Sequence, residues 1–134
     1  DKMDDKLGRA AIIENGSPLF SGGTSSGESQ IRRWLLDKDL IEAIIALPTD
    51  LFYNTGIATY IWVLSKNKRE ERKGKIQLID ASNIYHKLRK ALGNKKNEIT
   101  PKIVPKLHIF MLISKKMSYA KFTKMRNLCT VNIL

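Results

Sequence analysis

Four short, nearly continuous apolar runs constrain the fold of this chain more than any other feature of its sequence. They are GRAAIIE at 8–14, LIEAIIALP at 40–48, IATYIWVLS at 57–65 and KIQLIDA at 75–81. Runs of this length, bounded by Gly, Pro, Asn or charged residues, are typical of strands buried within a sheet. None approaches the roughly 20 apolar residues that a membrane-spanning helix requires. The sequence therefore predicts buried strands and no membrane partner.

A helix is expected between the first two runs. Ile31, Trp34 and Leu35 recur at the spacing of one helical face, which is expected to place Trp34 in the core. Ser25, with Glu28 three residues later, forms a capping box at the start of this helix. In a capping box the serine hydroxyl and the glutamate carboxylate bind backbone N–H groups that otherwise lack partners.

The order of these elements predicts the fold class. A strand, a helix, a strand and two adjoining strands are typical of the end of an open α/β sheet. The short link between 40–48 and 57–65 predicts an antiparallel pair at the edge of a mixed sheet. Trp62, within the third run, is expected in the core. The basic stretch at 82–100 is expected to form a helix that ends near Gly93, followed by a polar turn.

The net charge of +11 is concentrated near the C-terminal end of the sequence. Residues 101–134 hold seven Lys or Arg and no acid, whereas residues 1–100 hold 17 basic residues against 13 acidic ones. Because the first 100 residues are only mildly basic, the charge by itself is weak evidence for a nucleic-acid partner. The single cysteine, Cys129, excludes an intrachain disulfide, and the expected location is the reducing cytoplasm.

The sequence contains no metal-ligand or nucleophile motif. His86 and His108 are isolated, and the single cysteine has no partner at metal-ligand spacing. Gly22 and Gly27 have the spacing of a phosphate-binding loop, but Glu28 stands where that motif has lysine. A carboxylate in the first helical turn suits the helix dipole and repels a phosphate. The sequence therefore predicts no metal site and favours a capped loop over a nucleotide site.

The most informative segment is ALPTDLFYNTGIATYIWVLSKNK at 46–68, where a loop with two adjacent aromatic residues follows a strand. Ligands of open α/β sheets bind at such strand ends. Phe52 and Tyr53, beside the amide of Asn54, are able to stack on a nucleobase and to hydrogen-bond it. In the alternative interpretation, Leu51 and Phe52 belong to the core and the residues after them form a turn.

Five blocks of the sequence occur in the order and spacing of one family: NGSPLFSG, SSGESQIRRWLL, LIEAIIALPTDLFYNTGIATYIWVLSKNK, RKGKIQLIDAS and LRKALGNKKNEI. Over about residues 7–100 the chain closely resembles the modification subunit of type I restriction–modification systems, an adenine-N6 DNA methyltransferase. The resemblance implies the distal half of a Rossmann-like S-adenosylmethionine-dependent methyltransferase sheet. The family's glycine-rich cofactor motif and its Asn-Pro-Pro-aromatic catalytic motif precede these blocks and are absent here. The resemblance therefore implies that S-adenosylmethionine does not bind this fragment, which alone is inactive and holds no catalytic residue.

The resemblance also implies roles for individual residues. The loop LFYNTG matches the segment that walls the flipped target base in amino-methyltransferases, so Phe52 is the best stacking candidate, followed by Tyr53 and Asn54. Asn15 and Ser17 follow the neighbouring strand and are candidates for the same cleft. The candidate contacts to the DNA backbone are Lys87, Arg89, Lys90, Lys95 and Lys96. The alternative for these five residues is a solvated helix face.

The implied partners are DNA, a specificity subunit that reads the DNA sequence and a restriction subunit that cleaves it. Because half of an open sheet exposes an unpaired edge and apolar surface, self-association of the chain is a further prediction. The alternative function is a non-catalytic basic module that binds nucleic acid or docks on a protein.

Residues 1–100 are expected to be the C-terminal part of the methyltransferase catalytic domain, and residues 101–134 to be a basic tail of atypical sequence. The family continues with an acidic segment where this chain loses every acid. We hypothesise that the tail is an out-of-frame terminus without an evolved function. Part of the net charge would then say nothing about DNA binding.

Overall fold

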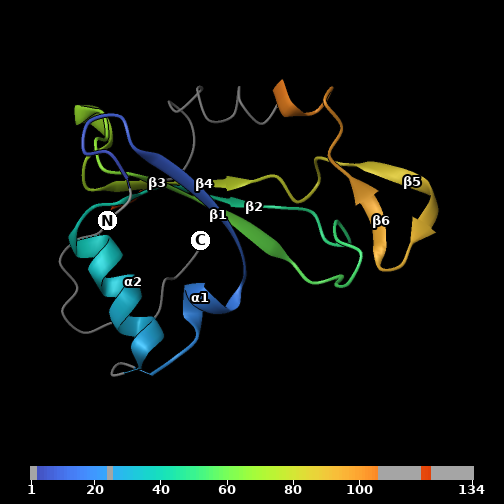
Figure 1. Cartoon of the computed structure of the whole chain (residues 1–134), viewed down its shortest axis with the longest axis horizontal. Helices are drawn as coiled ribbons and strands as arrows, with labels where there is room; N and C mark the ends of the chain where they lie inside the picture. Colours follow the sequence, from blue (N-terminus) through green and yellow to red (C-terminus); the bar gives the residue numbers. More distant parts are fainter. Residues whose placement is uncertain (1–2, 24–25, 106–118, 122–134) are drawn as a thin grey trace.

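The main element of the computed structural model, which describes residues 3–23, 26–105 and 119–121, is a mixed five-stranded sheet (Figure 1). Its strands are β1 (Arg9–Asn15), β2 (Ile41–Ala46), β3 (Thr59–Ser65), β4 (Lys75–Asp80) and β7 (Tyr119–Lys121). Their order is β1-β3-β2-β4-β7. The four apolar runs thus lie in one sheet, which confirms the predicted fold class.

The strand directions agree with the predicted mixed sheet. β3 runs antiparallel to both of its neighbours, β1 and β2, while β2 and β4 are parallel. The antiparallel pairing of β2 with β3 is confirmed, but β3 lies between β1 and β2 and not at an edge. The antiparallel strand at an edge of the described sheet is β7, which pairs with β4.

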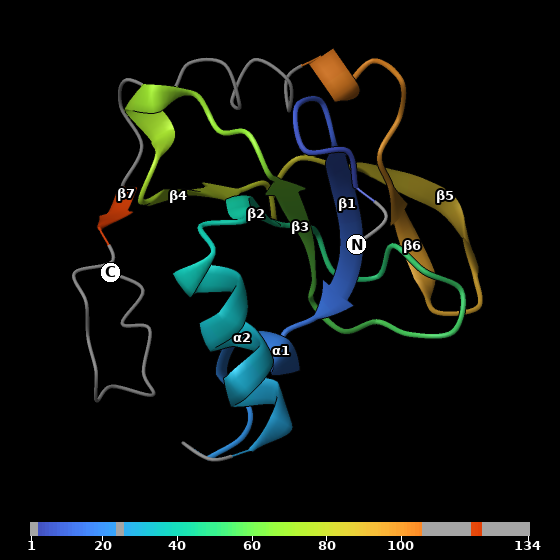
Figure 2. The same cartoon turned by 60° about the vertical axis from the view of Figure 1, so that its left-hand side comes forward.

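The helices α1 (Ser17–Phe20) and α2 (Gly27–Asp37) lie on one face of the sheet (Figure 1, Figure 2). The N-cap of α2 is Ser26, whose Oγ accepts a hydrogen bond from Ser29 N at 3.3 Å. The predicted cap at Ser25 is therefore wrong by one residue, and Ser25 itself lies outside the described residues. In the part of the chain that the structure describes, no helix is long and apolar enough to span a membrane.

The apolar side chains form two clusters, one on each face of the sheet. Successive side chains of a strand point to opposite faces. One cluster contains Ile41, Trp62 and Ile76, against which Leu35 of α2 packs. The other cluster has these buried members: Ala43, Ile45, Leu47, Val63, Ile79 and Ala81. The two clusters account for the near-continuous apolar character of β2 and β3.

Two predictions of burial are wrong in this structure. The run at 8–14 was expected to be a buried strand, but β1 is at the edge of the described sheet, and Ile12 and Ile13 are 45% and 54% exposed. Trp34 was expected in the core and is 55% exposed, because α2 turns its Leu35 side towards the sheet. Trp62 is buried, as predicted.

The segment 82–100 is a β-hairpin and not the predicted helix. Its strands are β5 (His86–Leu92) and β6 (Lys95–Glu98), which pair antiparallel as a separate two-stranded sheet. Gly93 has a φ of +61° and, with Asn94, forms the two-residue connection between paired Leu92 and Lys95. Glycine adopts this left-handed conformation without steric cost, which favours a hairpin turn at this point. Ile84 and Ile99, on either side of the hairpin, pack against the cluster around Ile45.

Candidate functional site

Three segments of the chain leave the sheet at the same edge. Asn15, the last residue of β1, pairs with Thr59, and Ala46, the last residue of β2, pairs with Tyr60 on one side and Asp80 on the other. The parallel strands β1, β2 and β4 therefore end together. We call the border of the sheet formed by these C-terminal strand ends the carboxyl edge, as distinct from the outer strands β1 and β7. Ligands of open α/β sheets bind at such an edge. The ten site residues predicted from the sequence all come from it or from the segments that follow it.

The loop between β2 and β3 presents two of the predicted base-binding side chains to solvent. Leu51 packs against the core, whereas Phe52 is half-buried and pairs with Thr55 across a tight turn. Tyr53 and Asn54 form the tip of this turn, and Tyr53 is 63% exposed. Beside the accessible aromatic face, Leu51 is therefore the residue of this part of the loop that packs against the core.

The hairpin contacts this loop directly. Lys96 N donates a hydrogen bond to Asp50 O at 2.9 Å, and Asn94 N donates to Tyr53 O at 3.0 Å. Lys95 Nζ lies 5.2 Å from the centroid of the Tyr53 ring, within the range of a cation–π interaction. The structure thus brings together Tyr53 of the predicted base pocket and Lys95 of the predicted DNA-backbone contacts. Asp50 was not singled out from the sequence, because it contributes a main-chain carbonyl.

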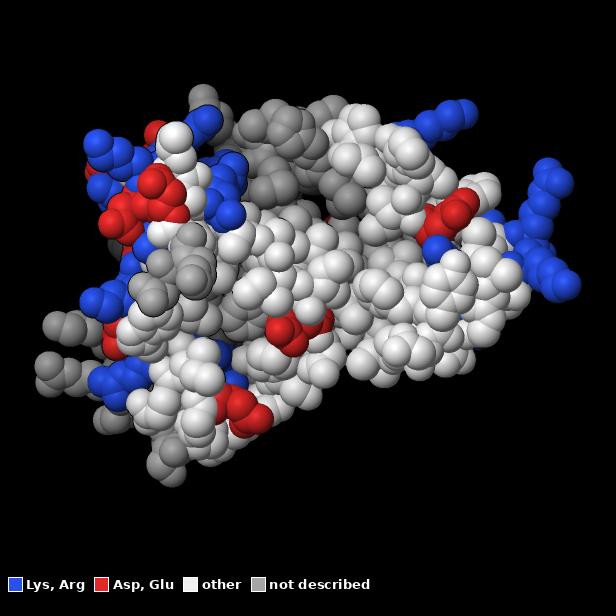
Figure 3. Space-filling view, viewed as in Figure 1, with Lys and Arg blue, Asp and Glu red and all other residues white. Residues whose placement is uncertain are grey.

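The five predicted backbone contacts belong to the strands of the hairpin. Four of them are exposed, and the fifth, Lys95, is half-buried beside the Tyr53 ring. The hairpin, His86–Glu98, contains these five cations and one acid, Glu98, at its last position. Figure 3 shows Lys and Arg side chains projecting from the end of the molecule that the hairpin forms. The helix in the alternative interpretation is wrong, since these cations lie on strands. A solvated face, here of a hairpin, stays the alternative to DNA contacts.

Asn15 and Ser17 lie at the carboxyl edge, where β1 gives way to α1. Asn15 Oδ1 accepts a hydrogen bond from Ser17 N at 2.9 Å, so these two residues form one local turn. Arg32 of α2 donates to the carbonyl oxygens of Pro18 and Ser21 at 3.0 and 2.6 Å and fixes the segment after this turn. Sequence reasoning missed this role of Arg32, because its partners are main-chain atoms.

The loop before α2 is filled by the chain's own side chains. Gly22 has a φ of +88°, and a Cβ at this position would lie 2.8 Å from Glu28 Oε2 and 2.0 Å from Ser26 Oγ. A carboxylate therefore stands close to the glycine turn in which a phosphate-binding loop holds its anion. This arrangement agrees with the capped loop and disagrees with a nucleotide site.

Asp80 places a charged carboxylate at the carboxyl edge. The side chain of Ser82 and its backbone N–H, which donates to Asp80 Oδ1 at 2.9 Å, hold the pKa of this carboxyl below its usual value of 3.8. The side-chain hydrogen bond is the larger cause. Asp80 is exposed, so its charge is also screened by solvent.

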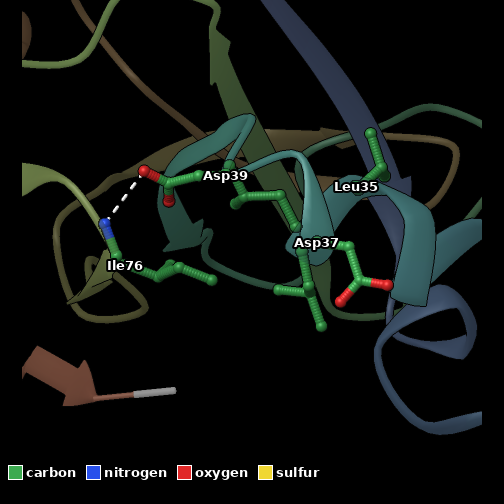
Figure 4. Close-up of a pocket in the computed structure, with 7 residues that line it drawn as sticks. Leu35, Asp37, Asp39 and Ile76 are labelled. Atoms are coloured by element: carbon green, nitrogen blue, oxygen red, sulfur yellow. Dashed lines mark hydrogen bonds between the residues drawn. The ribbon is translucent and has the colours of Figure 1, made fainter. Parts of the chain in front are cut away.

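A pocket of about 260 Å³ lies at the opposite edge, between α2 and the first residues of β2 and β4 (Figure 4). Its two carboxylates already have partners. Asp39 accepts hydrogen bonds from Gly74 N at 2.9 Å and from Lys68 Nζ, and Asp37 pairs with Arg33. Among the described residues, no group of three or more His, Cys, Asp or Glu is arranged to hold a metal ion.

The comparison with known proteins decides the family. The profile described as N-6 DNA Methylase matches residues 2–132. The chain belongs to this family. The match confirms the resemblance found in the sequence, and it continues past residue 100 into the segment that sequence analysis sets apart as a tail.

The relatives of this chain are much longer than the chain itself. It is 49% identical over 79 residues to the type I restriction enzyme MjaVIII methylase subunit of Methanocaldococcus jannaschii, a match that covers 59% of this chain and 13% of the relative. It is 33% identical over 115 residues to the type I restriction enzyme HindI methylase subunit of Haemophilus influenzae, over 86% of this chain and 25% of that protein.

A solved structure has the same fold. The methyltransferase subunit of a type I restriction-modification system from Streptococcus thermophilus superposes with a TM-score of 0.67 at 28% identity. The superposition covers 82% of this chain and 21% of that subunit. The chain therefore spans between 13% and 25% of the length of these three proteins.

Proposed function

We propose that this chain is part of a DNA adenine-N6 methyltransferase subunit of a type I restriction–modification complex, to which it contributes sheet and one wall of the target-base pocket. One observation carries the proposal. In a chain of the N-6 DNA Methylase family, the candidate residues come from the carboxyl edge or the segments that follow it, and Tyr53 of the candidate base pocket contacts Lys95 of the candidate DNA-backbone contacts. The family match disfavours the alternative of a non-catalytic basic module.

The roles of the site residues follow from the chemistry of a base that must leave the duplex to react. Phe52 and Tyr53 offer aromatic faces for an extruded adenine, and stacking of this kind contributes about 1–3 kcal/mol per base. Asn54, exposed beside them, offers an amide for hydrogen bonds. The cations of the hairpin bind phosphates and set the register of the protein on the DNA, so binding weakens as salt rises.

S-adenosylmethionine supplies the methyl group in the complete subunit. We propose that it binds elsewhere in that subunit, because the pocket beside α2, among the residues that the structure describes, does not suit it. A cofactor of this type needs a free carboxylate for its ribose hydroxyls. In the pocket beside α2, Asp39 and Asp37 are engaged by Lys68 and Arg33. The sequence also holds no glycine-rich turn after a strand with an acid at the required spacing.

The surface of β1 and α2 supports the proposal that the rest of the subunit packs against this chain. Ile31 and Trp34 of α2 are 62% and 55% exposed, and Ile12 of β1 is 45% exposed. A groove of about 300 Å³ between α1, α2 and the sheet is lined mostly by apolar side chains such as Leu35 and Leu64. Contiguous apolar surface of this kind marks an interface.

The further partners that we propose are DNA and the specificity and restriction subunits of the complex, in the cytoplasm. One solved structure with the same fold, at 16% identity and a TM-score of 0.53, comes from work on complex assembly of a type I R-M system. Self-association of the isolated chain through the uncovered surface of β1 and α2 remains a prediction.

The test is Phe52→Ala in the complete methylase polypeptide, assembled with its specificity subunit and assayed for methyl transfer to DNA. Loss of one stacking contact is expected to lower kcat/KM by about 5- to 150-fold. Leu51→Ala is the control, because Leu51 precedes Phe52 in the same loop and packs against the core. This control is expected to lower the thermal midpoint by more than Phe52→Ala does.

Two results would contradict the proposal. If the wild-type polypeptide transfers no methyl group to adenine, the proposed function is wrong. If the loss of kcat/KM in Phe52→Ala comes with an equally large loss of stability, Phe52 is a core residue and does not form a wall of the base pocket.

A further inference from the structure

Asn97 of β6 is a buried polar residue that joins the hairpin to the loop between β2 and β3. The residue as a whole is 7% exposed. Its side-chain Nδ2 donates a hydrogen bond to Thr49 O at 3.0 Å. Its backbone N donates to Asp50 O at 3.0 Å, where Lys96 N also donates. One residue of the hairpin therefore binds two consecutive carbonyl groups of the loop.

The loop needs such support, because its backbone is in an unfavourable conformation. Asp50 has a φ of +56°, in the left-handed region that non-glycine residues seldom adopt. Its carbonyl is the acceptor of the two hydrogen bonds from the hairpin. The hairpin thus holds Asp50 in the conformation that turns the chain towards Phe52 and Tyr53.

The packing at this contact leaves little room for movement. A Cβ at Gly93 would lie 2.8 Å from Tyr53 O, and a Cβ at Gly56 would lie 2.6 Å from Asp50 Oδ1. The hairpin is itself fixed to the core, because Ile84 and Ile99 pack on the face of the sheet around Ile45. The sheet holds the hairpin, and the hairpin holds the loop.

We propose that Asn97 is a positioning residue for base binding, acting through Thr49 and Asp50 on the aromatic tip at Phe52 and Tyr53. It touches neither the base nor the phosphates. Through this contact Phe52 and Tyr53 move with the hairpin cations as one rigid body. A hairpin bound to the DNA backbone therefore holds these two aromatic side chains at a fixed distance from the target base. The inference rests on the proposed function and assigns the hairpin a second role in it.

The experiment compares Asn97→Ala with Asn94→Ala in the complete methylase polypeptide assembled with its specificity subunit. Asn94 is a matched control, because it is the same residue type in the same hairpin, is exposed, and contacts Tyr53 O through its backbone N, which alanine retains. Methyl transfer gives kcat and the KM for DNA, and 2-aminopurine at the target position reports extrusion of the base by its fluorescence.

Asn97→Ala is expected to lower kcat by about 10- to 100-fold, since a misplaced positioning group has effects of this size. The KM for DNA should change little, because the hairpin cations remain. The 2-aminopurine signal should fall, whereas Asn94→Ala should match the wild type in all three readouts. Amide hydrogen exchange on the same proteins should show faster exchange in residues 49–55 and unchanged protection in β2 and β3.

Each other outcome overturns the inference in a distinguishable way. Wild-type kcat and 2-aminopurine signal in Asn97→Ala would show that the loop needs no such support, and the proposed function would stand. Loss of protection in β2 and β3 as well would make Asn97 a residue of the general fold. If the wild-type polypeptide shows no methyl transfer to DNA, both the proposed function and this inference are wrong.

Discussion

The strands β1 and β2 are both rich in isoleucine and alanine, yet they differ in burial. In β2, Ile41 and Ile45 are 3% and 5% exposed, whereas in β1 Ile12 and Ile13 are 45% and 54% exposed. β2 has a neighbour on each side, while β1 pairs only with β3 at the edge of the described sheet. An apolar strand at an edge is a site for pairing with another segment. We infer that the second neighbour of β1 lies outside the described residues, in the rest of the methylase polypeptide.

The largest expected effect is the difference in free energy of unfolding between matched substitutions in β2 and β1. Ile45→Ala removes a buried side chain from β2 and is expected to lower the free energy of unfolding of this chain by about 2–5 kcal/mol. Ile13→Ala in β1 is the control and should lower it by less than about 1 kcal/mol, because that side chain is half exposed to solvent. Urea denaturation measures both. Equal losses would show that β1 is buried in this chain and would break the contrast.

A second effect concerns the buried ion pair that precedes β2, whereas the ion pair at the start of β1, Arg9 with Glu42, has an exposed arginine. The Lys68 side chain is 2% exposed, and its ammonium group pairs with Asp39 and donates to Lys75 O at 3.1 Å. Asp39→Ala leaves this charge buried with a single acceptor, so it is expected to lower the free energy of unfolding by about 3 kcal/mol. Asp37→Ala, which removes an exposed carboxylate from the same pocket, should change it by less than about 1 kcal/mol. A stability unchanged by Asp39→Ala in urea denaturation would contradict the role of this pair.

The smallest expected effect is a pH dependence at the carboxyl end of β4. The pKa of Asp80 is lowered by the hydrogen bonds from Ser82. A carboxyl whose pKa is lower in the folded state stabilises the fold above its unfolded pKa, and that contribution is lost as the pH falls through the folded pKa. Asp80→Asn should therefore lose less stability than the wild type on acidification below the usual carboxyl pKa of 3.8. The measurement is the thermal midpoint of the wild type and of Asp80→Asn as a function of pH. If the two midpoints fall by the same amount on acidification, these hydrogen bonds have no effect on stability.

The strands could be predicted from the sequence, because apolar runs such as LIEAIIALP leave few alternatives to a buried strand. The exposure of β1 could not be predicted, because it depends on whether a second strand pairs with β1 and not on the apolar run at 8–14 itself. The hairpin was missed because its basic residues show no apolar period, and the decisive signal was the Gly93-Asn94 pair. Read as a hairpin turn, that pair would have predicted two strands.

The candidate site could be predicted only in part. The aromatic residues after β2 and the cations of 87–96 stand out in the sequence by residue type. Their contact could not be predicted, because the hydrogen bonds that make it end on main-chain carbonyls at Thr49, Asp50 and Tyr53. Main-chain acceptors are the same at every position, so a sequence does not distinguish the ones that are used.

The most direct test of the account is amide hydrogen exchange along β1, Arg9–Asn15, in this chain and in the complete methylase polypeptide. Among the described residues no strand pairs with β1 on the side away from β3, so about half of the amides of the strand in this chain should exchange rapidly. In the complete polypeptide we expect every amide of β1 to be protected, because a further strand pairs with it. Rapid exchange of the same amides in the complete polypeptide would contradict the claim that this chain is one part of a larger methylase sheet.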